Sequence, residues 1–314
     1  MKQVNTTLGS ISLDQLGKVD MHEHVIIDWS NNERIPQDFH HTDIDLIASD
    51  LLAWKAAEGG AIIDSSPIGA GRNVQLLNEV SLVSQVPIIV ATGFHKLSYY
   101  PPNHWLFHAS TNELADLLNK ECTEGVLMDE DQPFDSGKHI VKANIIKIGI
   151  DRSGLTPVIR NVIDAAAEVI GGCGIPCMIH TEPGVPFEEV IGYFEQQKIH
   201  PSKVMICHMG KSLNPELFQD LAEKGYFLEF DEMIRPAPPL DLLVQSIRSL
   251  VDHCYGENIL FAGDLARRSY WTCYGGDPGL AYLVSGLEDK LMALGFTPEM
   301  LAQIWVENPK EYFV

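Results

Sequence analysis

The sequence predicts a closed (β/α)8 barrel, the TIM-barrel fold, in which eight parallel strands alternate with eight helices. Short apolar runs alternate with longer amphipathic stretches along the whole chain. Several runs, such as PIIVATG and NILFAGD, are apolar on consecutive residues, which is typical of parallel strands buried on both faces. The 314 residues, of which 45% are hydrophobic, also exceed the roughly 250 that this fold requires. We therefore expect one α/β domain over residues 1–314.

The elements follow in order along the chain. Strands are expected at residues 19–24, 61–65, 88–92, 145–149, 177–181, 204–208, 227–230 and 259–263. Helices are expected between and after them, at residues 43–58, 73–85, 112–124, 157–173, 187–197, 215–224, 240–254 and 279–294. Thr156-Pro157 and Asn214-Pro215 predict helix starts, because each pairs a capping side chain with proline in the first turn. Gly225 predicts a helix end.

The long segments 28–42 and 93–110 follow the first and third strands, so we expect them to shape a substrate site over one rim. Segment 125–141 is expected to be partly irregular, and 297–306 and 309–313 to form terminal helices that close the far side. A doubly wound open sheet is the alternative fold. It does not explain why reactive side chains end strands one, four, five, six and eight.

Composition limits the possible partners. The net charge of −21 argues against nucleic acid and anionic membranes, which are bound by basic surfaces. The first residues lack the apolar core of a secretory signal, and no apolar run is long enough to span a membrane, so a cytoplasmic protein is expected. None of the six cysteines forms a CxxC motif, and we expect reduced thiols.

Six side chains that can bind metals each end an apolar run. They are His22, His24, Lys147, His180, His208 and Asp264. His22 and His24 are two residues apart, which places both imidazoles on one face of a strand. In a barrel the ends of these strands share one rim, so the six side chains would converge there. Each residue alone also has a structural interpretation, as a core histidine or a helix cap, but the set predicts a hydrolase with two metals.

Lys147 is the most informative of the six. Lysine is seldom buried without a partner, and here isoleucines surround it in the sequence. Burial lowers the pKa of an amine, and a neutral amine can react with CO2 to give a carbamate that bridges two cations. An internal ion pair with an aspartate is the structural alternative. Imidazole and carboxylate ligands favour Zn2+, with Mn2+, Co2+ and Fe2+ as alternatives. His40, His41, His104 and His108 do not end expected strands and are not expected to bind metal.

This arrangement resembles the phosphotriesterase family of the amidohydrolase superfamily. The similarity rests on the HxH of the first strand, the lysine, the two later histidines and the aspartate, together with DRSGLTP and IHTEPG, and it covers nearly the whole chain. The resemblance implies two divalent ions, usually zinc, bridged by a carboxylated lysine. His22, His24 and Asp264 would hold the first ion, His180 and His208 the second, and Lys147 would bridge them. It also implies a possible homodimer, which no feature of the sequence requires.

The loops ATGFHKLSYYPP, EFDEMIRPAPP and GDLARRSYW look like the branch of this family that opens phosphorylated sugar lactones. They differ from the apolar mouth expected of an acyl-homoserine lactonase. Basic and phenolic side chains in them suit a phosphate, and the expected substrate contacts are Lys96, Tyr99, Arg235, Arg267, Arg268 and Tyr270. We expect a phosphorylated pentono-1,4-lactone as substrate, with Asp264 carrying the proton.

Three other functions remain open from the sequence. A promiscuous phosphotriesterase or carboxylesterase on the same scaffold would prefer bulky apolar esters and would not depend on the arginines. A barrel without catalytic activity, which binds a metal or a partner protein, would not need all six side chains. A mononuclear deaminase-like enzyme would not need Lys147.

Overall fold

Eight parallel strands form the central sheet of the computed structural model, which describes residues 2–30, 35–134 and 136–314. The strands are β3 (Lys18–Glu23), β4 (Gly59–Asp64), β5 (Ile88–Phe94), β6 (Ala143–Gly149), β7 (Cys177–His180), β8 (Val204–Ile206), β9 (Phe227–Phe230) and β10 (Ile259–Phe261). Their order in the sheet is their order in the chain, and every neighbouring pair is parallel. The predicted fold class is confirmed.

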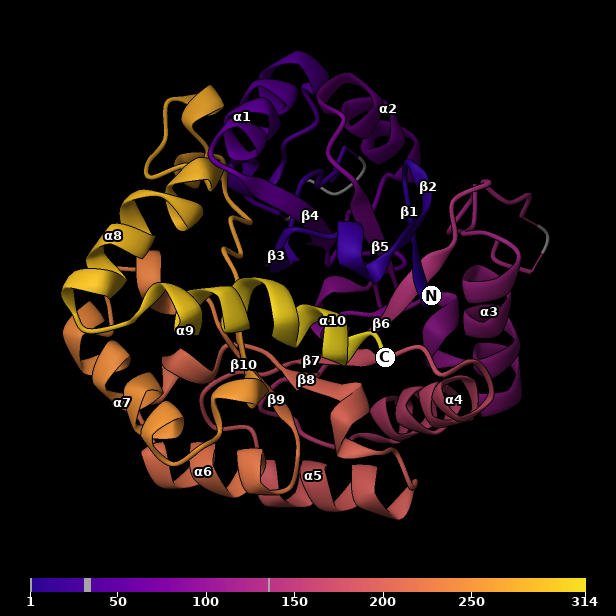
Figure 1. The fold of residues 1–314 in the computed structure, drawn as a ribbon. Helices are drawn as coiled ribbons and strands as arrows, with labels where there is room; N and C mark the ends of the chain where they lie inside the picture. Colours follow the sequence, from indigo (N-terminus) through magenta and orange to yellow (C-terminus); the bar gives the residue numbers. More distant parts are fainter. Residues whose placement is uncertain (1, 31–34, 135) are drawn as a thin grey trace.

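The helices surround the strands as an outer ring (Figure 1). The ring contains α1 (Ile44–Ala56), α2 (Val74–Ser84), α3 (Thr111–Thr123), α4 (Pro157–Cys173), α5 (Phe187–Gln196), α6 (Pro215–Glu223), α7 (Leu240–Asp252) and α8 (Gly286–Ala293). The predicted start signals are present, because the side chains of Thr156 and Asn214 cap α4 and α6 ahead of Pro157 and Pro215. None of the helices within the described residues is long and apolar enough to cross a membrane.

Two expected helical segments differ from the prediction. Residues 279–294 form a short 3-10 helix (Leu280–Val284) followed by α8, because Ser285, with φ −130° and ψ −94°, interrupts the helical backbone. The two terminal helices instead run on without a break as α9 (Pro298–Ala302), a π-helical turn (Gln303–Glu307) and α10 (Asn308–Tyr312). Pro309 is accommodated because it stands in the first turn of α10.

Buried carboxylates close the barrel between its first and last strands. β3 and β10 share no ladder within the described sheet, but the Asp264 N–H donates to the His22 carbonyl at 2.8 Å. The Glu23 carboxyl oxygen Oε1 accepts the N–H groups of both His24 and Leu265, each at 2.7 Å. The residue between the two histidines therefore fixes the position of β3 relative to the loop that carries Asp264.

The opposite end of the barrel is closed by the two chain termini. An antiparallel hairpin, β1 (Gln3–Thr6) and β2 (Gly9–Ser12), packs there and was not predicted. Tyr312 of α10 is fully buried, and its hydroxyl donates to the Cys177 carbonyl at the start of β7 at 2.6 Å. The predicted closure by terminal helices is present, and only the other end of the barrel remains for a site.

Candidate metal centre

The six side chains singled out in the sequence meet at the carboxyl end of the barrel. Lys147 lies on β6 and is fully buried. His22 lies on β3, His24 directly after it, and His180 at the end of β7. His208 and Asp264 lie just beyond β8 and β10.

Nitrogen and oxygen atoms that could serve as ligands face one another here. The Lys147 Nζ lies 3.0 Å from the His22 Nε2, and the His208 Nε2 lies 2.8 Å from the His180 Nδ1. One carboxylate oxygen of Asp264 is 3.5 Å from the His24 Nε2 and 3.8 Å from the His22 Nε2. The strands therefore bring all six residues into one cluster, hereafter the six-residue cluster.

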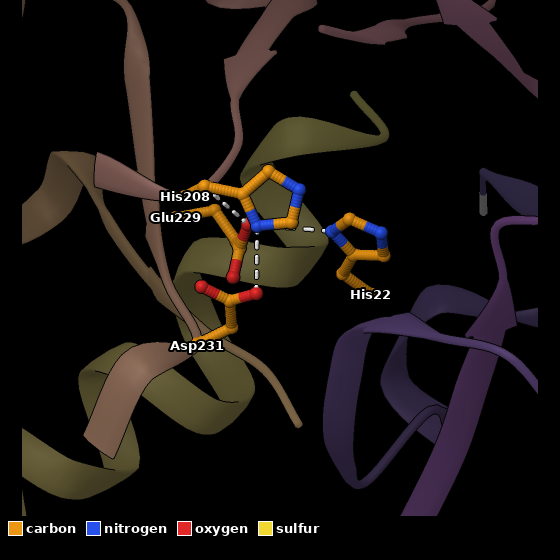
Figure 2. Close-up of side chains that lie close together, drawn as sticks. All are labelled: His22, His208, Glu229 and Asp231. Atoms are coloured by element: carbon orange, nitrogen blue, oxygen red, sulfur yellow. Dashed lines mark hydrogen bonds and ion pairs between the residues drawn. The ribbon is translucent and has the colours of Figure 1, made fainter. Parts of the chain in front are cut away.

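Oxygen atoms behind the rings orient three of the histidines. The His208 Nδ1 lies 2.7 Å from an Asp231 carboxylate oxygen, and the His24 Nδ1 lies 2.9 Å from the Ser66 hydroxyl. The His22 Nδ1 lies 3.4 Å from Glu229. Figure 2 shows His22 and His208 turned toward each other, with the two carboxylates beside His208. Histidines that bind metals in proteins are commonly held in this way, which leaves the Nε2 atoms for the centre of the site.

Two residues of the six-residue cluster have unusual backbone conformations. His208 has φ 64° and Asp264 has φ 45°, in the left-handed region that residues other than glycine seldom adopt. Such strain is typically concentrated at functional sites, where the surrounding structure holds it in place. For Asp264 that support includes its N–H bond to His22 and the Arg235 guanidinium, which donates to the Asp264 carbonyl.

Burial sets the charge of the cluster. It lowers the pKa values of His22, His24 and His180 well below 6.5, so these imidazoles are neutral in the folded protein. Burial also lowers the pKa of the Lys147 amine, and burial together with Asp231 raises the pKa of the Asp264 carboxyl. Neutral imidazole is the form that binds a metal. The neutral amine is the form that reacts with CO2, and a lowered pKa increases the fraction of lysine in that form.

The residues present fit a pair of divalent cations. Four imidazoles, one carboxylate and one buried amine form the nitrogen and oxygen ligand set that zinc favours. The His180 Nε2 is buried and has no hydrogen-bond partner among the described residues. His22, His24 and Asp264 also form a group of possible ligand atoms that all lie within 4.8 Å of one another.

The sequence profile of the phosphotriesterase family matches residues 2–313. The chain belongs to this family. It is therefore a metal-dependent hydrolase, and its buried histidine and carboxylate cluster agrees with the binuclear metal chemistry of phosphotriesterase-family enzymes.

Relatives within the family differ in the activities for which they are named. A phospho-furanose lactonase of Mycoplasmopsis synoviae is 28% identical, with 98% of this chain and 91% of that protein aligned. The N-acetyltaurine hydrolase of Mus musculus is 25% identical, over 99% of this chain and 97% of that protein. The crystal structure of a lactonase from Listeria monocytogenes superimposes with a TM-score of 0.89 at 25% identity, covering 100% of this chain and 99% of the other.

Four of the predicted substrate contacts lie near the six-residue cluster. Arg235 approaches a side-chain oxygen of Asp264 at 3.3 Å and stacks on the Tyr270 ring at 4.3 Å. Lys96 donates to Glu182 at 2.5 Å, and Tyr99 lies against its ammonium group. These four residues lie at the rim of the barrel. Lys96 and Arg235 are already paired with carboxylates, and contact of any of the four with a substrate stays a prediction.

The two adjacent arginines contact other loops. Arg267 lies 3.9 Å from Asp38 and stacks on Phe39, with about half of its side chain exposed. Arg268 stacks on Tyr274 at 4.9 Å, and its Nε is buried without a hydrogen-bond partner among the described residues. Arg268 therefore retains an unused donor, whereas Arg267 already has an acidic neighbour.

Several buried groups near the rim were not predicted. Glu229 and Asp231 lie behind the histidines of the six-residue cluster. Asp20 and Glu23 accept backbone N–H groups where β3 meets the loop after β10. In the sequence, the only signal that separates these carboxylates from solvent-exposed ones is their place in strands that are expected to be buried. Glu232 is buried with no hydrogen bond to either carboxylate oxygen within the described residues, and burial and Asp231 raise its pKa to about 11.

His41 was expected to lie in a loop and not to bind metal. It lies in the loop that follows β3, where it is fully buried against the backbone of His24. Its Nε2 lies 2.6 Å from the His24 carbonyl oxygen and so acts as a donor, and its Nδ1 has no partner among the described residues. Burial lowers the pKa of His41 to about 4. His41 thus supports the backbone of His24 as a neutral imidazole.

We expect His41→Gln to reduce the sensitivity of the metal-free protein to acid. Below pH 6.5 the unfolded chain binds a proton at His41 that the folded chain does not bind, so stability is lost as the pH falls toward about 4. Between pH 8 and pH 5, wild type should lose about 2 kcal/mol more than the variant in free energy of unfolding. Glutamine keeps an N–H donor for the His24 carbonyl. Identical pH dependence in denaturant titrations of both proteins would contradict this role for His41.

Proposed function

We propose that this chain is a binuclear metal lactonase that opens a phosphorylated sugar lactone, namely a pentono-1,4-lactone bearing a 5-phosphate. The observation that carries the proposal is the convergence on one rim of six side chains, five of them buried, in a family of metal-dependent hydrolases. The phospho-furanose lactonases of Mycoplasmopsis synoviae and Mycoplasmopsis agalactiae, at 28% and 27% identity, support the substrate class.

His22, His24 and Asp264 would hold one divalent ion, and His180 and His208 the other, with zinc as the favoured metal. Lys147, carboxylated on its neutral amine, would bridge the two. When bound, the two ions would supply a hydroxide nucleophile at neutral pH and a Lewis acid for the carbonyl of the substrate. The short contact between Lys147 and His22 supports the bridging position.

Asp264 is positioned to carry the proton. We infer that its carboxylate takes the proton of the attacking hydroxide and delivers it to the leaving ring oxygen. Burial raises the pKa of this carboxyl above its ordinary value, which makes it a better proton acceptor. Arg235 holds the residue through its carbonyl and its carboxylate, so the acceptor oxygen is fixed before the substrate arrives.

The charges around the rim indicate where a phosphate would bind. A cavity of about 560 Å³ between the loops that follow β3, β4 and β5 is lined by the carboxylates of Asp28, Glu130 and Asp131, which would repel it. Arg72 also lines this cavity, but its guanidinium is already paired with Glu121 and Glu130. The loops that follow β9 and β10 instead carry Arg235, Arg268 and Tyr270. We therefore place the phosphate on that side, with the Arg268 guanidinium as its principal contact.

The test is turnover of the zinc-loaded enzyme on D-ribono-1,4-lactone with and without a 5-phosphate. We expect kcat/KM to be about 100-fold higher for the phosphorylated lactone, since a charge-assisted hydrogen bond contributes about 1.5–3 kcal/mol. Arg268→Met should remove most of this preference. Arg160→Met should not remove the preference, because Arg160 lies on α4, where it pairs with Glu189 of α5.

Other outcomes point elsewhere. Equal rates on the two lactones would refute the phosphate site. Absence of lactone turnover together with hydrolysis of N-acetyltaurine or of an apolar ester would refute the lactonase proposal and place the chain with another activity of the same family.

A further inference from the structure

His95 lies within the rim of the barrel but is neither one of the six residues nor one of the predicted contacts. It directly follows β5, where it continues the series of residues that face the barrel interior, Ile89, Ala91 and Gly93. Its side chain is 6% exposed. The ring centroid of His95 lies 4.7 Å from that of His180 and 4.5 Å from that of Tyr99. His95 therefore lies between a proposed metal ligand and a residue at the rim.

The neighbouring strand leaves room for this ring. Gly149 of β6 is aligned with His180 of β7 and contributes no side chain at that level. A Cβ atom on Gly149 would lie 2.2 Å from the Lys96 nitrogen and 2.8 Å from the His95 Cα. Only glycine at position 149 leaves space for the backbone of His95 and Lys96. The rings of His95 and His180 can therefore contact each other over β6.

Hydrogen bonds fix both the backbone and the tautomer of His95. Its own N–H donates to the Tyr100 hydroxyl at 2.9 Å, which in turn donates to the Ile68 carbonyl at 2.8 Å. The N–H of Lys96 donates to the His95 Nδ1 at 2.8 Å. Because the Nδ1 accepts this bond, it carries no proton, and the proton of the neutral ring must be on the Nε2.

The N–H at the Nε2 has no acceptor among the residues that the structure describes, and the ring that carries it borders the cluster. Since the Nδ1 faces the backbone, His95 cannot ligate through that atom, and the protonated Nε2 is a donor rather than a metal ligand or a base. A neutral donor held in place before the substrate binds stabilises negative charge that develops on a substrate oxygen.

We propose that His95 is a catalytic residue that donates its Nε2–H to an oxygen at the reacting end of the substrate. The substrate class rests on the proposed function. The position beside His180 and one level above Lys147 favours the carbonyl or ring oxygen of the lactone over the distal phosphate, which we placed near Arg268. The contact is therefore expected to act on kcat more than on KM.

The first test compares His95→Phe with His95→Gln on D-ribono-1,4-lactone 5-phosphate. Phenylalanine keeps a ring for stacking but has no donor, and we expect kcat to fall about 100-fold with KM changed less than about threefold. Glutamine restores an N–H donor and should recover at least about a tenth of the wild-type kcat. His200→Phe is the matched control, because the His200 Nδ1 also accepts a backbone N–H but lies at the exposed turn before β8. Wild-type kcat for His95→Phe would overturn the proposal.

The second test does not depend on turnover. In the wild-type enzyme labelled with 15N-histidine, we expect His95 to give, at pH 8, the spectrum of a ring protonated at the Nε2. Acetate, used as a probe for an oxygen at the reacting end of the substrate, should shift that N–H resonance. A ring protonated at the Nδ1, or an N–H resonance that acetate does not move, would overturn the proposal. If the wild type opens no lactone, the proposed function fails, and this spectrum alone decides the role of His95.

Discussion

Lys147→Met is expected to lower kcat by about a thousandfold, equivalent to about 4 kcal/mol in the activation barrier. Methionine fills the same space without an amine, so no carbamate can form and the two metals lose their bridge. The variant should retain fewer than two zinc ions per chain, because the remaining ligands form two separate groups. Steady-state kinetics and elemental analysis of the purified variant measure both effects.

Stability provides a control for this variant. Lys147 is fully buried and its pKa is lowered by burial, so replacing the amine by an apolar group should not destabilise the metal-free protein. Lys224→Met, which changes an exposed lysine paired with Glu195, should leave metal content and kcat unchanged. A Lys147→Met variant with two bound zinc ions and wild-type kcat would rule out the bridging role.

Asp264→Asn should lower kcat by about 10²–10⁴-fold, the range typical of a lost proton-transfer group. Asparagine tolerates the left-handed backbone at this position, where φ is 45°, so the fold should be kept. Arg235 can still donate to the carbonyl of residue 264. The amide cannot accept the proton of the attacking hydroxide. Its weaker affinity for metal is compensated by assaying at saturating zinc.

Asp252→Asn is the matched control, since Asp252 lies on the surface of α7 and pairs only with Arg248 among the described residues. It should behave as wild type. Turnover by Asp264→Asn at the wild-type rate with both metals bound would refute the proton role, while leaving Asp264 as a candidate ligand.

The strands and the six-residue cluster could be predicted because their signals are local. Lys147 stands among isoleucines, and His22 and His24 share the spacing that puts two side chains on one face of a strand. Eight apolar runs of strand length then determine the order of the barrel. No comparable local signal marks the hairpin of residues 3–12, which has few apolar residues and is held by contacts with β5 and β6 that are distant in sequence.

His95 was missed because the third strand was expected to end at residue 92, whereas β5 continues to Phe94. Gly93 appeared to begin the loop, yet it pairs with Lys147 within the sheet. Because His95 comes two residues after Gly93, its side chain lies on the same interior face of the barrel rather than in solvent. The partners of Arg267 and Lys96 could not be predicted either, because Asp38 and Glu182 are brought to them by loops from other strands.

The most direct test of the account is the crystal structure of the zinc-loaded protein, with anomalous diffraction recorded at the zinc edge. The account predicts two zinc peaks about 3.5–4 Å apart at the carboxyl end of the barrel. One should be ligated by His22, His24 and Asp264 and the other by His180 and His208, with density for a carboxylated Lys147 between them. A single peak, or zinc held by Glu229 and Asp231 with an unmodified Lys147, would contradict the binuclear site.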